Sequence, residues 1–237
     1  MLSGVVLAAG EGRRLRPLTE QWPKPILPID GRPVIATLLL ELRAAGLSEV
    51  TVVVGHLAEQ VEDLLGDGSG FGLSIRYATQ PAPLGSADAV RRALDAGAEL
   101  PLLVAGADTV FSRGDIQAAA ATWSASGAAG GLGVRPVPPG ELERRAPVRA
   151  SGGRVIALGG EADDRAGARK LAAAPLWFLD DRFVGRLEAL PGPPYELAEA
   201  GRRLLEAGET ILALELRPTR DLTHPEDVVR HNYAYLG

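Results

Sequence analysis

The chain has 237 residues, of which 46 % are hydrophobic and 23 % charged, and its formal net charge is −5. This length and apolar content suit one large α/β domain with a sizeable core. The acidic balance argues against a nucleic-acid partner, and the lack of cysteine excludes disulfides and thiolate metal sites. No apolar run reaches the ~18 residues of a membrane-spanning helix, and the N-terminus lacks a basic leader. We expect a cytoplasmic protein with no membrane contact.

The first half of the chain alternates between apolar runs typical of strands and helical patterns. We predict strands at 2–8, 50–54, 74–78 and 102–105, and helices at 33–45, 58–65 and 87–96. Val50–Val54 is apolar throughout, which is typical of a strand covered on both faces. The alternation predicts right-handed βαβ units and a mostly parallel sheet.

The second half is less regular. The patterns predict helices at 116–124, 196–207 and 225–236, and strands at 130–135, 154–158, 174–179 and 210–216. The stretches 140–153 and 159–169 are polar and charged, so we predict loops there. The chain contains neither an internal repeat nor a low-complexity linker, so we expect residues 1–237 to form a single domain.

A glycine turn closes the first predicted strand, at Gly10-Glu11-Gly12. Backbone N–H groups at such a turn are a common anion site. The sequence lacks the third glycine of a dinucleotide-binding fingerprint and the Gly-Lys-Ser/Thr of a P-loop. Lys24, held between two prolines, is one of only two lysines among 25 basic residues. A compact ammonium retained in so arginine-rich a chain favours a phosphate-handling site.

The N-terminal stretch resembles the signature of the sugar-1-phosphate nucleotidylyltransferases, the NDP-sugar pyrophosphorylases. The resemblance lies in Leu7-Ala8-Ala9-Gly10-x-Gly12-x-Arg14-Leu15-x-Pro17-Leu18-Thr19, then Pro23-Lys24-Pro25-x-Leu27-Pro28. Segments near Gly66, Gln80, Asp108, Glu196 and Asp221 extend it along the chain, closest to the glucose-1-phosphate thymidylyl- and uridylyltransferases. It implies a Rossmann-like three-layer α/β sandwich with a mixed, mostly parallel sheet, of the nucleotide-diphospho-sugar transferase type. The left-handed β-helix domain of longer relatives is not expected.

The resemblance also implies roles for individual residues. Those of the nucleotide site would be Leu7, Ala8, Ala9, Gly10, Gly12, Arg14, Lys24, Gln80 and Gly85. Arg14, Lys24 and Asp108 would be catalytic, with Arg14 on the β- and γ-phosphates and Lys24 on the α-phosphate. Gln80 would offer a donor and an acceptor to a uracil or thymine edge. Asp108 and Asp221 would together hold Mg²⁺, with Mn²⁺ as the alternative.

The sugar half of the expected site departs from the family pattern. Relatives carry a Glu-Lys-Pro segment whose lysine grips the sugar phosphate, whereas this chain has no lysine around Glu161. Pro175 replaces a family glycine near the sugar. We assign the sugar-phosphate site to Glu161, Lys170 and Trp177, with Lys170 supplying the missing ammonium. An ordinary exposed lysine is the alternative, with Arg165 or Arg169 as the next candidate.

The sequence therefore predicts an Mg²⁺-dependent transferase that joins an NTP, UTP or dTTP by preference, to a sugar 1-phosphate. The alternatives are an enzyme for another phosphorylated alcohol (an amino-sugar, heptose or inositol phosphate) and a nucleotide-sugar-binding regulator that has lost catalysis. The NTP and the sugar phosphate are the expected partners, and homo-oligomer formation is left open.

Overall fold

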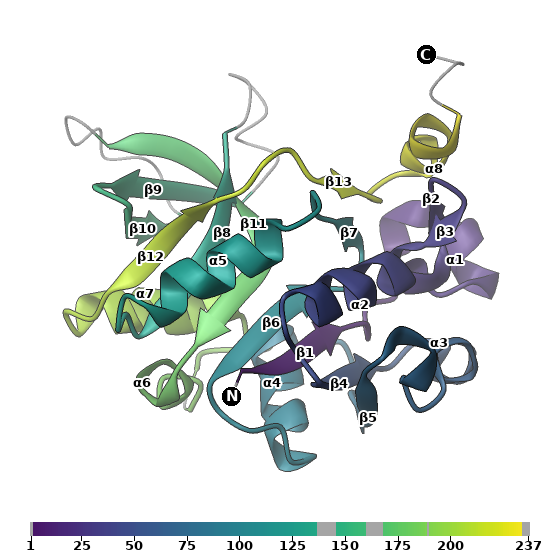
Figure 1. Ribbon diagram of the computed structural model, residues 1–237, viewed down its shortest axis with the longest axis horizontal. Helices are drawn as coiled ribbons and strands as arrows, with labels where there is room; N and C mark the ends of the chain where they lie inside the picture. The colour runs from purple at the N-terminus through teal and green to yellow at the C-terminus, as the bar shows by residue number, and fades with distance from the viewer. Residues whose placement is uncertain (1, 137–145, 160–167, 189, 234–237) are drawn as a thin grey trace.

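The computed structural model describes residues 2–136, 146–159, 168–188 and 190–233. They form a three-layer α/β structure around one large mixed sheet (Figure 1). No helix within the described ranges is both long and apolar enough to cross a membrane. The α/β fold class predicted from the sequence is confirmed.

The central sheet has nine strands in the order β5-β4-β1-β6-β11-β8-β12-β10-β9. The bounds of these strands in chain order are β1 Ser3–Leu7, β4 Glu49–Val54, β5 Ser74–Thr79, β6 Leu102–Gly106, β8 Gly130–Arg135, β9 Pro147–Ser151, β10 Arg154–Leu158, β11 Arg169–Leu179 and β12 Ile211–Glu215. The pairs β5–β4, β4–β1 and β1–β6 are parallel. The carboxyl ends of these four strands therefore meet at one edge, which is where α/β sheets bind ligands.

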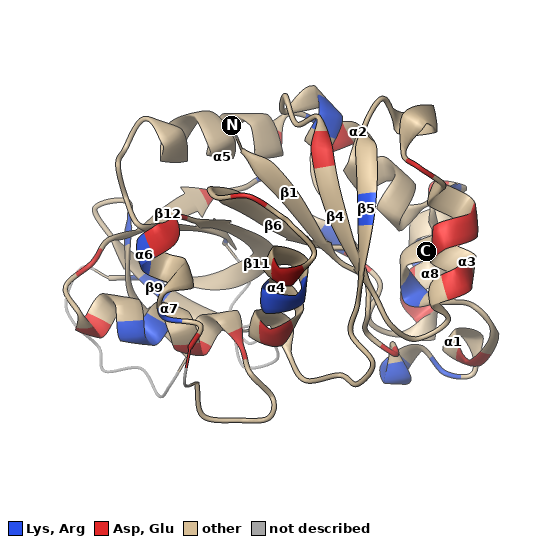
Figure 2. Cartoon of the chain, turned by 90° about the horizontal axis from the view of Figure 1, so that it is seen from below, with Lys and Arg blue, Asp and Glu red and all other residues tan. Residues whose placement is uncertain are grey.

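Helices cover both faces of the sheet (Figure 2). One face packs against α2 (Val34–Ala44), α3 (Ala58–Leu65) and α5 (Asp115–Ser124). The other packs against α4 (Ser86–Asp95), α6 (Asp181–Val184) and α7 (Leu197–Glu206). Side chains alternate across a strand, so Val5 and Val6 of β1 lie in different cores and are both fully buried.

The second half of the sheet curls back on itself. Strand β11 pairs with β6 and β8 and, through its first residues, also with β9. Its pairing with β8 is irregular between Ala173 and Trp177, where Pro175 lies. Proline has no N–H to donate, so a break in the ladder is where a strand tolerates it. This curl forms a wall facing the carboxyl ends of the parallel strands.

Short elements complete the carboxyl edge. They are α1 (Leu18–Gln21), β2 (Pro28–Ile29), β3 (Arg32–Pro33), β7 (Thr109–Val110), β13 (Arg220–Asp221) and α8 (Pro225–Asn232), with 3₁₀ turns at Arg13–Leu15 and Lys24–Ile26. A further 3₁₀ turn, Ser69–Phe71, precedes β5 at the opposite edge of the sheet. A third apolar cluster, separate from the two main cores, lies beneath them. Its members are Leu15, Leu27, Ile29, Val34, Val110 and Leu222. We call it the anchor cluster.

Most predicted elements recur with boundary shifts of one or two residues, and α3, β8 and β10 recur unchanged. The prediction of a loop at 140–153 is wrong at β9, and β11 begins at Arg169 rather than Ala174. The two-residue strands were not predicted, because two residues carry no periodic pattern. Helix α8 ends at Asn232 within the described residues, and most of the predicted loop 159–169 lies outside them.

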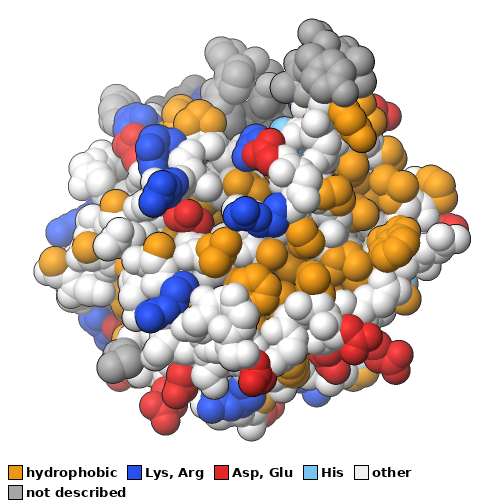
Figure 3. All heavy atoms as spheres, turned by 45° about the vertical axis from the view of Figure 1, so that its right-hand side comes forward, with side chains coloured by type: hydrophobic (Ala, Val, Ile, Leu, Met, Phe, Trp, Pro, Cys, Tyr) orange, Lys and Arg blue, Asp and Glu red, His pale blue; other side chains and the backbone are white. Residues whose placement is uncertain are grey.

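One face of the molecule carries a broad hydrophobic area (Figure 3). An apolar groove of about 880 Å³ lies between α1, α3 and β2. Trp22 on its rim is 54 % exposed, and Leu18 and Leu64 are also exposed. An apolar patch of this kind is typical of a contact surface, and it lies beside the segment that carries Lys24.

Candidate active site

Two cavities open at the carboxyl edge of the parallel strands. The first has a volume of about 490 Å³ and the second about 970 Å³. Both are lined by Arg14, Lys24, Asp108 and Thr223, so they meet at these four side chains. Ligands in the two cavities would therefore lie next to each other at these side chains.

The first cavity brings together all nine residues that the sequence predicted for a nucleotide: Leu7, Ala8, Ala9, Gly10, Gly12, Arg14, Lys24, Gln80 and Gly85. The carboxyl end of β1 is fixed by its neighbours, since Ala8 N–H donates to Val53 O (2.8 Å) and Ala107 N–H to Leu7 O (3.1 Å). Among the described residues, no hydrogen bond is made by the N–H groups of Gly10, Glu11 or Gly12. These donors are available to an anion.

Glycine is required at positions 10 and 12 of this loop for different physical reasons. Gly12 is left-handed (φ +61°), and a Cβ there would lie 2.9 Å from Thr19 Cγ2. The Thr19 hydroxyl in turn donates to Gly12 O at 2.9 Å, which ties the loop to α1. A Cβ on Gly10 would meet no protein atom within 4 Å. Gly10 therefore leaves open space in the cavity, as a close-fitting ligand requires.

The three arginines near the loop, Arg13, Arg14 and Arg16, differ in whether they have an acidic partner. Arg13 pairs with Glu11 at 2.8 Å, and Arg16 lies 3.8 Å from the same carboxylate. The Arg13 hydrogen bond holds the pKa of Glu11 below its ordinary value. Arg14 lines both cavities, and its guanidinium makes no ion pair or hydrogen bond with any residue in the described ranges. Arg14 is thus the arginine of this loop that can receive an anion.

Gln80 is buried, and both protons of its amide are engaged. Nε2 donates to Gly85 O (3.0 Å) and to Asp88 Oδ2 (2.8 Å). Both partners can only accept, so they fix the orientation of the amide. Gln80 therefore presents its carbonyl oxygen alone to the first cavity. This corrects the prediction that Gln80 offers a donor as well as an acceptor.

An ion pair between Lys24 and Asp108 stands where the two cavities meet. Lys24 is positioned by the 3₁₀ turn Lys24–Ile26, and Asp108 follows β6 directly before β7. The Lys24 side chain is only 15 % exposed, whereas Asp108 is 35 % exposed. Thr109 Oγ1 also donates to Asp108 Oδ1 at 3.2 Å. The charges of Lys24 and Asp108 thus offset each other, and Arg14 is left as the net positive charge among the four side chains of the junction.

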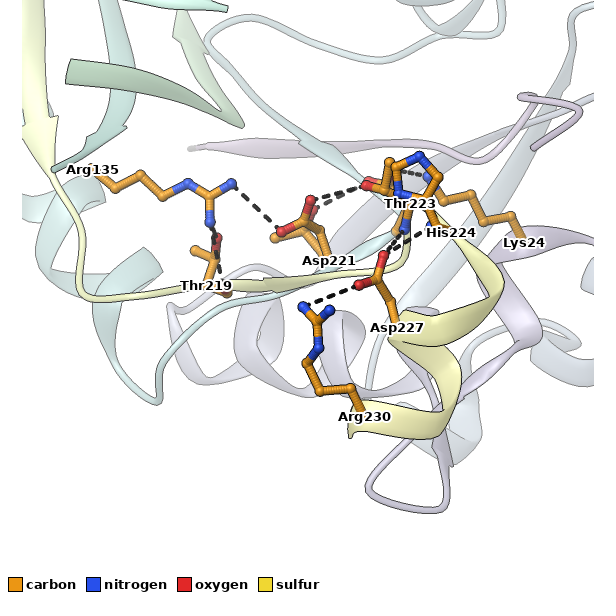
Figure 4. Close-up of polar contacts among 10 residues, drawn as sticks. Lys24, Arg135, Thr219, Asp221, Thr223, His224, Asp227 and Arg230 are labelled. Carbon is orange, nitrogen blue, oxygen red and sulfur yellow. Dashed lines mark hydrogen bonds and ion pairs between the residues drawn. The ribbon is translucent and has the colours of Figure 1, made fainter. Parts of the chain in front are cut away.

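Asp221 reaches the second cavity from β13 (Figure 4). It is brought beside Asp108 because β13 pairs antiparallel with β7, with Asp221 opposite Thr109. Leu222 N–H donates to Asp108 O at 3.3 Å, closing this ribbon. Thr223 Oγ1 donates to Asp221 Oδ2 at 3.2 Å, and Arg135 Nη2 lies 3.5 Å from Asp221 Oδ1.

The start of α8 is held by a capping box. Thr223 N–H and His224 N–H donate to Asp227 Oδ2 at 2.9 and 2.8 Å. Burial acts to raise the pKa of Asp227, but these two hydrogen bonds and the Arg230 charge outweigh it and lower the pKa. Asp227 is thus ionised and stabilises α8, whose N-terminus carries Thr223 to both cavities.

Asp108 and Asp221 fit a Mg²⁺ site in their chemistry. Mg²⁺ commonly takes one or two carboxylates and completes its octahedral shell with phosphate oxygens and water. Within the described ranges, no group of three or more His, Asp or Glu side chains could form an all-protein metal site. Asp221 on β13 and Asp108, directly before the paired strand β7, line the same cavity and match a site that substrate oxygens and water complete.

Of the residues predicted for the sugar phosphate, the two that the structure describes, Lys170 and Trp177, line neither cavity. Lys170 is exposed within β11, opposite Arg149 of β9, and lines neither cavity. Trp177 is 9 % exposed and packs edge-to-face on Phe183, with ring centroids 5.7 Å apart. Glu161 and Arg165 lie outside the described residues, and Arg169 pairs with Glu215. Pro175 does line the second cavity.

Sequence reasoning missed several lining residues. Arg135 lies at the end of β8, Thr223 at the start of α8, and Ser86 and Glu196 on the rim of the first cavity. Ser86 Oγ donates to Glu196 Oε2 at 2.5 Å across 110 positions of sequence. Such contacts join residues far apart in the sequence, so a local pattern does not predict them. Of these residues, Arg135 alone gave a usable signal, because it is an arginine at the end of a buried strand.

Residues 3–145 match the family model described as "Nucleotidyl transferase", and the chain belongs to this family. The resemblance seen in the sequence is thereby confirmed. An N-acetylmuramate alpha-1-phosphate uridylyltransferase from Neisseria meningitidis serogroup B is 40 % identical over 126 residues, 53 % of each chain. A CMP-5'-(3-aminopropyl)phosphonate synthase from Streptomyces rubellomurinus is 36 % identical over 200 residues, which is 78 % of this chain and 30 % of that one.

The chain spans about half the length, or less, of the curated relatives it matches. Among solved structures, a UDP-glucose pyrophosphorylase from Acinetobacter baumanii superposes with a TM-score of 0.83. It covers 98 % of this chain and 92 % of its own at 19 % sequence identity. This likeness confirms the nucleotidyltransferase fold.

Two glycines of the first cavity predict opposite effects of an added methyl group. At Gly10 the methyl meets no protein atom, so Gly10→Ala should leave the melting temperature unchanged and raise the KM for NTP about tenfold or more. At Gly85 (φ +102°) the Cβ would lie 2.3 Å from Tyr195 O, so Gly85→Ala should lower stability by about 1–3 kcal/mol. Thermal unfolding and NTP titration of both variants measure this. A Gly10→Ala enzyme with the unaltered KM would contradict the reading of this loop.

Proposed function

We propose that this chain transfers a nucleotidyl group from UTP or dTTP to a sugar 1-phosphate, giving an NDP-sugar and pyrophosphate, with Mg²⁺ or Mn²⁺ as the metal. One observation carries the proposal. A cavity lined by the nucleotide signature meets a second cavity whose lining includes Asp108 and Asp221, and Arg14, Lys24 and Asp108 stand at their junction. The first cavity suits the NTP and the second suits the acceptor.

The reaction needs charge and alignment more than a base. An acceptor phosphate is already ionised at pH 7, and its oxygen forms a new bond to the α-phosphorus while the bond to the β-phosphate oxygen breaks. The electron pair of the broken bond leaves with pyrophosphate, and no proton has to move. Catalysis is then in-line positioning together with neutralisation of the crowded phosphates.

The residues divide this work by position. The free N–H groups of Gly10–Gly12 and the Arg14 guanidinium would hold the β- and γ-phosphates, which leave. Lys24 would exchange its contact with Asp108 for the α-phosphate and the attacking phosphate. Asp108 and Asp221 would hold Mg²⁺, which supplies positive charge to the phosphate oxygens when bound.

The acceptor is the less constrained substrate. The relatives are named for uridylyl, thymidylyl and guanylyl transfer to sugar phosphates and for a phosphonate. Pyrophosphate release with each NTP against glucose 1-phosphate, mannose 1-phosphate, N-acetylglucosamine 1-phosphate, inositol phosphate and an aminoalkyl phosphonate tests the proposal. Release with UTP or dTTP and a sugar 1-phosphate supports it, and no release with any pair overturns it.

Removing the Lys24 ammonium should nearly abolish turnover. A charge contact made in a transition state contributes ~3 kcal/mol or more, which is about a hundredfold in rate. Lys24→Ala should fold normally, because the Asp108 carboxylate left behind is partly exposed to water. Arg16→Ala, in the same segment but outside both cavities, is the matched control. Near-normal kcat in Lys24→Ala would remove the centre of the proposal.

Activity should require a divalent metal ion. We expect EDTA to abolish pyrophosphate release, Mg²⁺ or Mn²⁺ to restore it, and Asp108→Asn to reproduce the loss even in excess Mg²⁺. Thr109→Val is a control, since it removes only the 3.2 Å hydrogen bond to Asp108 Oδ1. Steady-state rates against metal concentration measure the effect. Full activity in EDTA would refute the assignment of Asp108 and Asp221.

The fixed amide of Gln80 should select the base. Uracil and thymine present an N3–H to an acceptor, whereas cytosine has no hydrogen on N3. UTP or dTTP should therefore exceed CTP, and also GTP and ATP, by at least about tenfold in kcat/KM, since one mismatched buried hydrogen bond costs about 1–3 kcal/mol. Asp88→Asn frees the amide to rotate and should narrow the ratio of UTP to CTP. A preference for CTP or GTP in the unaltered protein would contradict this orientation.

A further inference from the structure

The second cavity has to neutralise an acceptor phosphate beside two aspartates, and the expected lysine is missing. Lys170 and Arg169 lie on β11 and line neither cavity. We propose that Arg135 supplies this charge, as a phosphate-binding residue for the acceptor. The inference rests on the proposed function and adds a residue that neither the sequence motif nor the comparisons assign.

Arg135 is a buried arginine in the wall of the second cavity. It ends β8 and is 8 % exposed, and its Nη1 donates to Thr219 Oγ1 (2.5 Å) and to Thr219 O (3.3 Å). Its Nη2 lies 3.5 Å from Asp221 Oδ1 (Figure 4). A guanidinium is rarely buried without a charge to meet. Thr219 holds the group in place, and Nη2 faces the carboxylate at the reaction centre.

The other cations of this cavity have different positions. Arg14 lines both cavities and is assigned above to the β- and γ-phosphates of the NTP. Lys24 is engaged by Asp108 at the junction. Arg220 pairs with Asp30 at 2.5 Å and Arg230 with Asp227 at 3.4 Å, and their side chains are 41 % and 71 % exposed. Exposed charges are screened by water and contribute little. Arg135 is the buried arginine that contacts Asp221, and unlike Lys24 it lines the second cavity without lining the first.

The surroundings of Arg135 leave room for a ligand. Ala146, Ala173 and Pro175 line the cavity on the same side, and none of them carries a polar side chain. A phosphate next to Asp221 would gain a charge-assisted hydrogen bond from Nη2 without moving the Thr219 contacts. The guanidinium would also offset the repulsion between a phosphate dianion and the two aspartates.

The test separates acceptor binding from NTP and metal binding. In Arg135→Gln, we expect the KM for the best sugar 1-phosphate of the panel to rise about 10- to 100-fold. The KM for NTP and the Mg²⁺ concentration for half-maximal rate should change less than about twofold. Arg217→Gln is the control, because Arg217 pairs with Asp115 at 2.7 Å and lines neither cavity. Thr219→Val, which loosens Arg135, should raise the acceptor KM by a smaller factor.

Two outcomes would overturn the inference. An unchanged acceptor KM in Arg135→Gln, in a protein whose melting temperature is normal, would remove the phosphate contact. A raised requirement for Mg²⁺ at constant acceptor KM would make Arg135 a positioning residue for Asp221 instead. Should Arg135→Gln not fold, Arg135→Lys keeps the charge but loses the planar guanidinium. A rise in the acceptor KM without a rise in the KM for NTP would then support the inference, and an unchanged acceptor KM would overturn it. Absence of pyrophosphate release in the unaltered protein is a different result, which refutes the proposed function itself.

Discussion

The geometry of the site depends on the anchor cluster of Leu15, Leu27, Ile29, Val34, Val110 and Leu222. The segments that carry Arg14, Lys24, Asp108 and Asp221 each contribute at least one of these buried side chains. Leu15 follows Arg14, and Leu222 follows Asp221. Short loops have little structure of their own, so a shared apolar contact is what fixes them relative to one another. Burial of the anchor cluster beneath the carboxyl edge of the sheet thereby fixes the positions of the charged side chains that line the cavities.

Two pairs of opposite charges face each other in the site when no substrate is bound, while Arg14 makes no ion pair with any residue that the structure describes. Lys24 meets Asp108, and Arg135 stands beside Asp221. Each pair leaves a cation and an anion ready for different partners, a phosphate for the cation and a metal ion for the carboxylate. Polyphosphate and metal together can replace both pairs without leaving a buried charge unmatched, which is the condition for burying ions at modest cost.

The sequence was informative where a pattern is local. The strand–turn–helix order of the first half, the Gly10–Gly12 loop and Lys24 were predicted from neighbouring residues, and the structure brings the predicted nucleotide residues into one cavity. Asp108 and Asp221 lie far apart in the chain and were paired only through the resemblance, whereas the structure joins them by the β7–β13 ribbon. The family of the chain, inferred from these motifs, is confirmed.

Prediction failed where tertiary contacts decide. Strand β9 is short, with the sequence Pro-Val-Arg-Ala-Ser, and forms because β10 and β11 both pair with it. Lys170 was expected beside the sugar phosphate from its rarity and its position, yet β11 begins early and includes it. Arg135 gave only the signal of a charge at the end of an apolar strand, since its partners Thr219 and Asp221 come from the other end of the chain.

The central claim is that Lys24 and Asp108 separate when the substrates bind. Lys24 then contacts the phosphates, and Asp108 binds the metal ion. A crystal structure with Mg²⁺ and a UTP analogue that carries a non-cleavable α–β bridge tests it most directly. The account predicts Lys24 Nζ within hydrogen-bond distance of an α-phosphate oxygen, Mg²⁺ on Asp108 and Asp221, and the uracil N3–H on Gln80 Oε1. A bound analogue with the Lys24–Asp108 pair still closed and the triphosphate away from Gly10–Gly12 would contradict it.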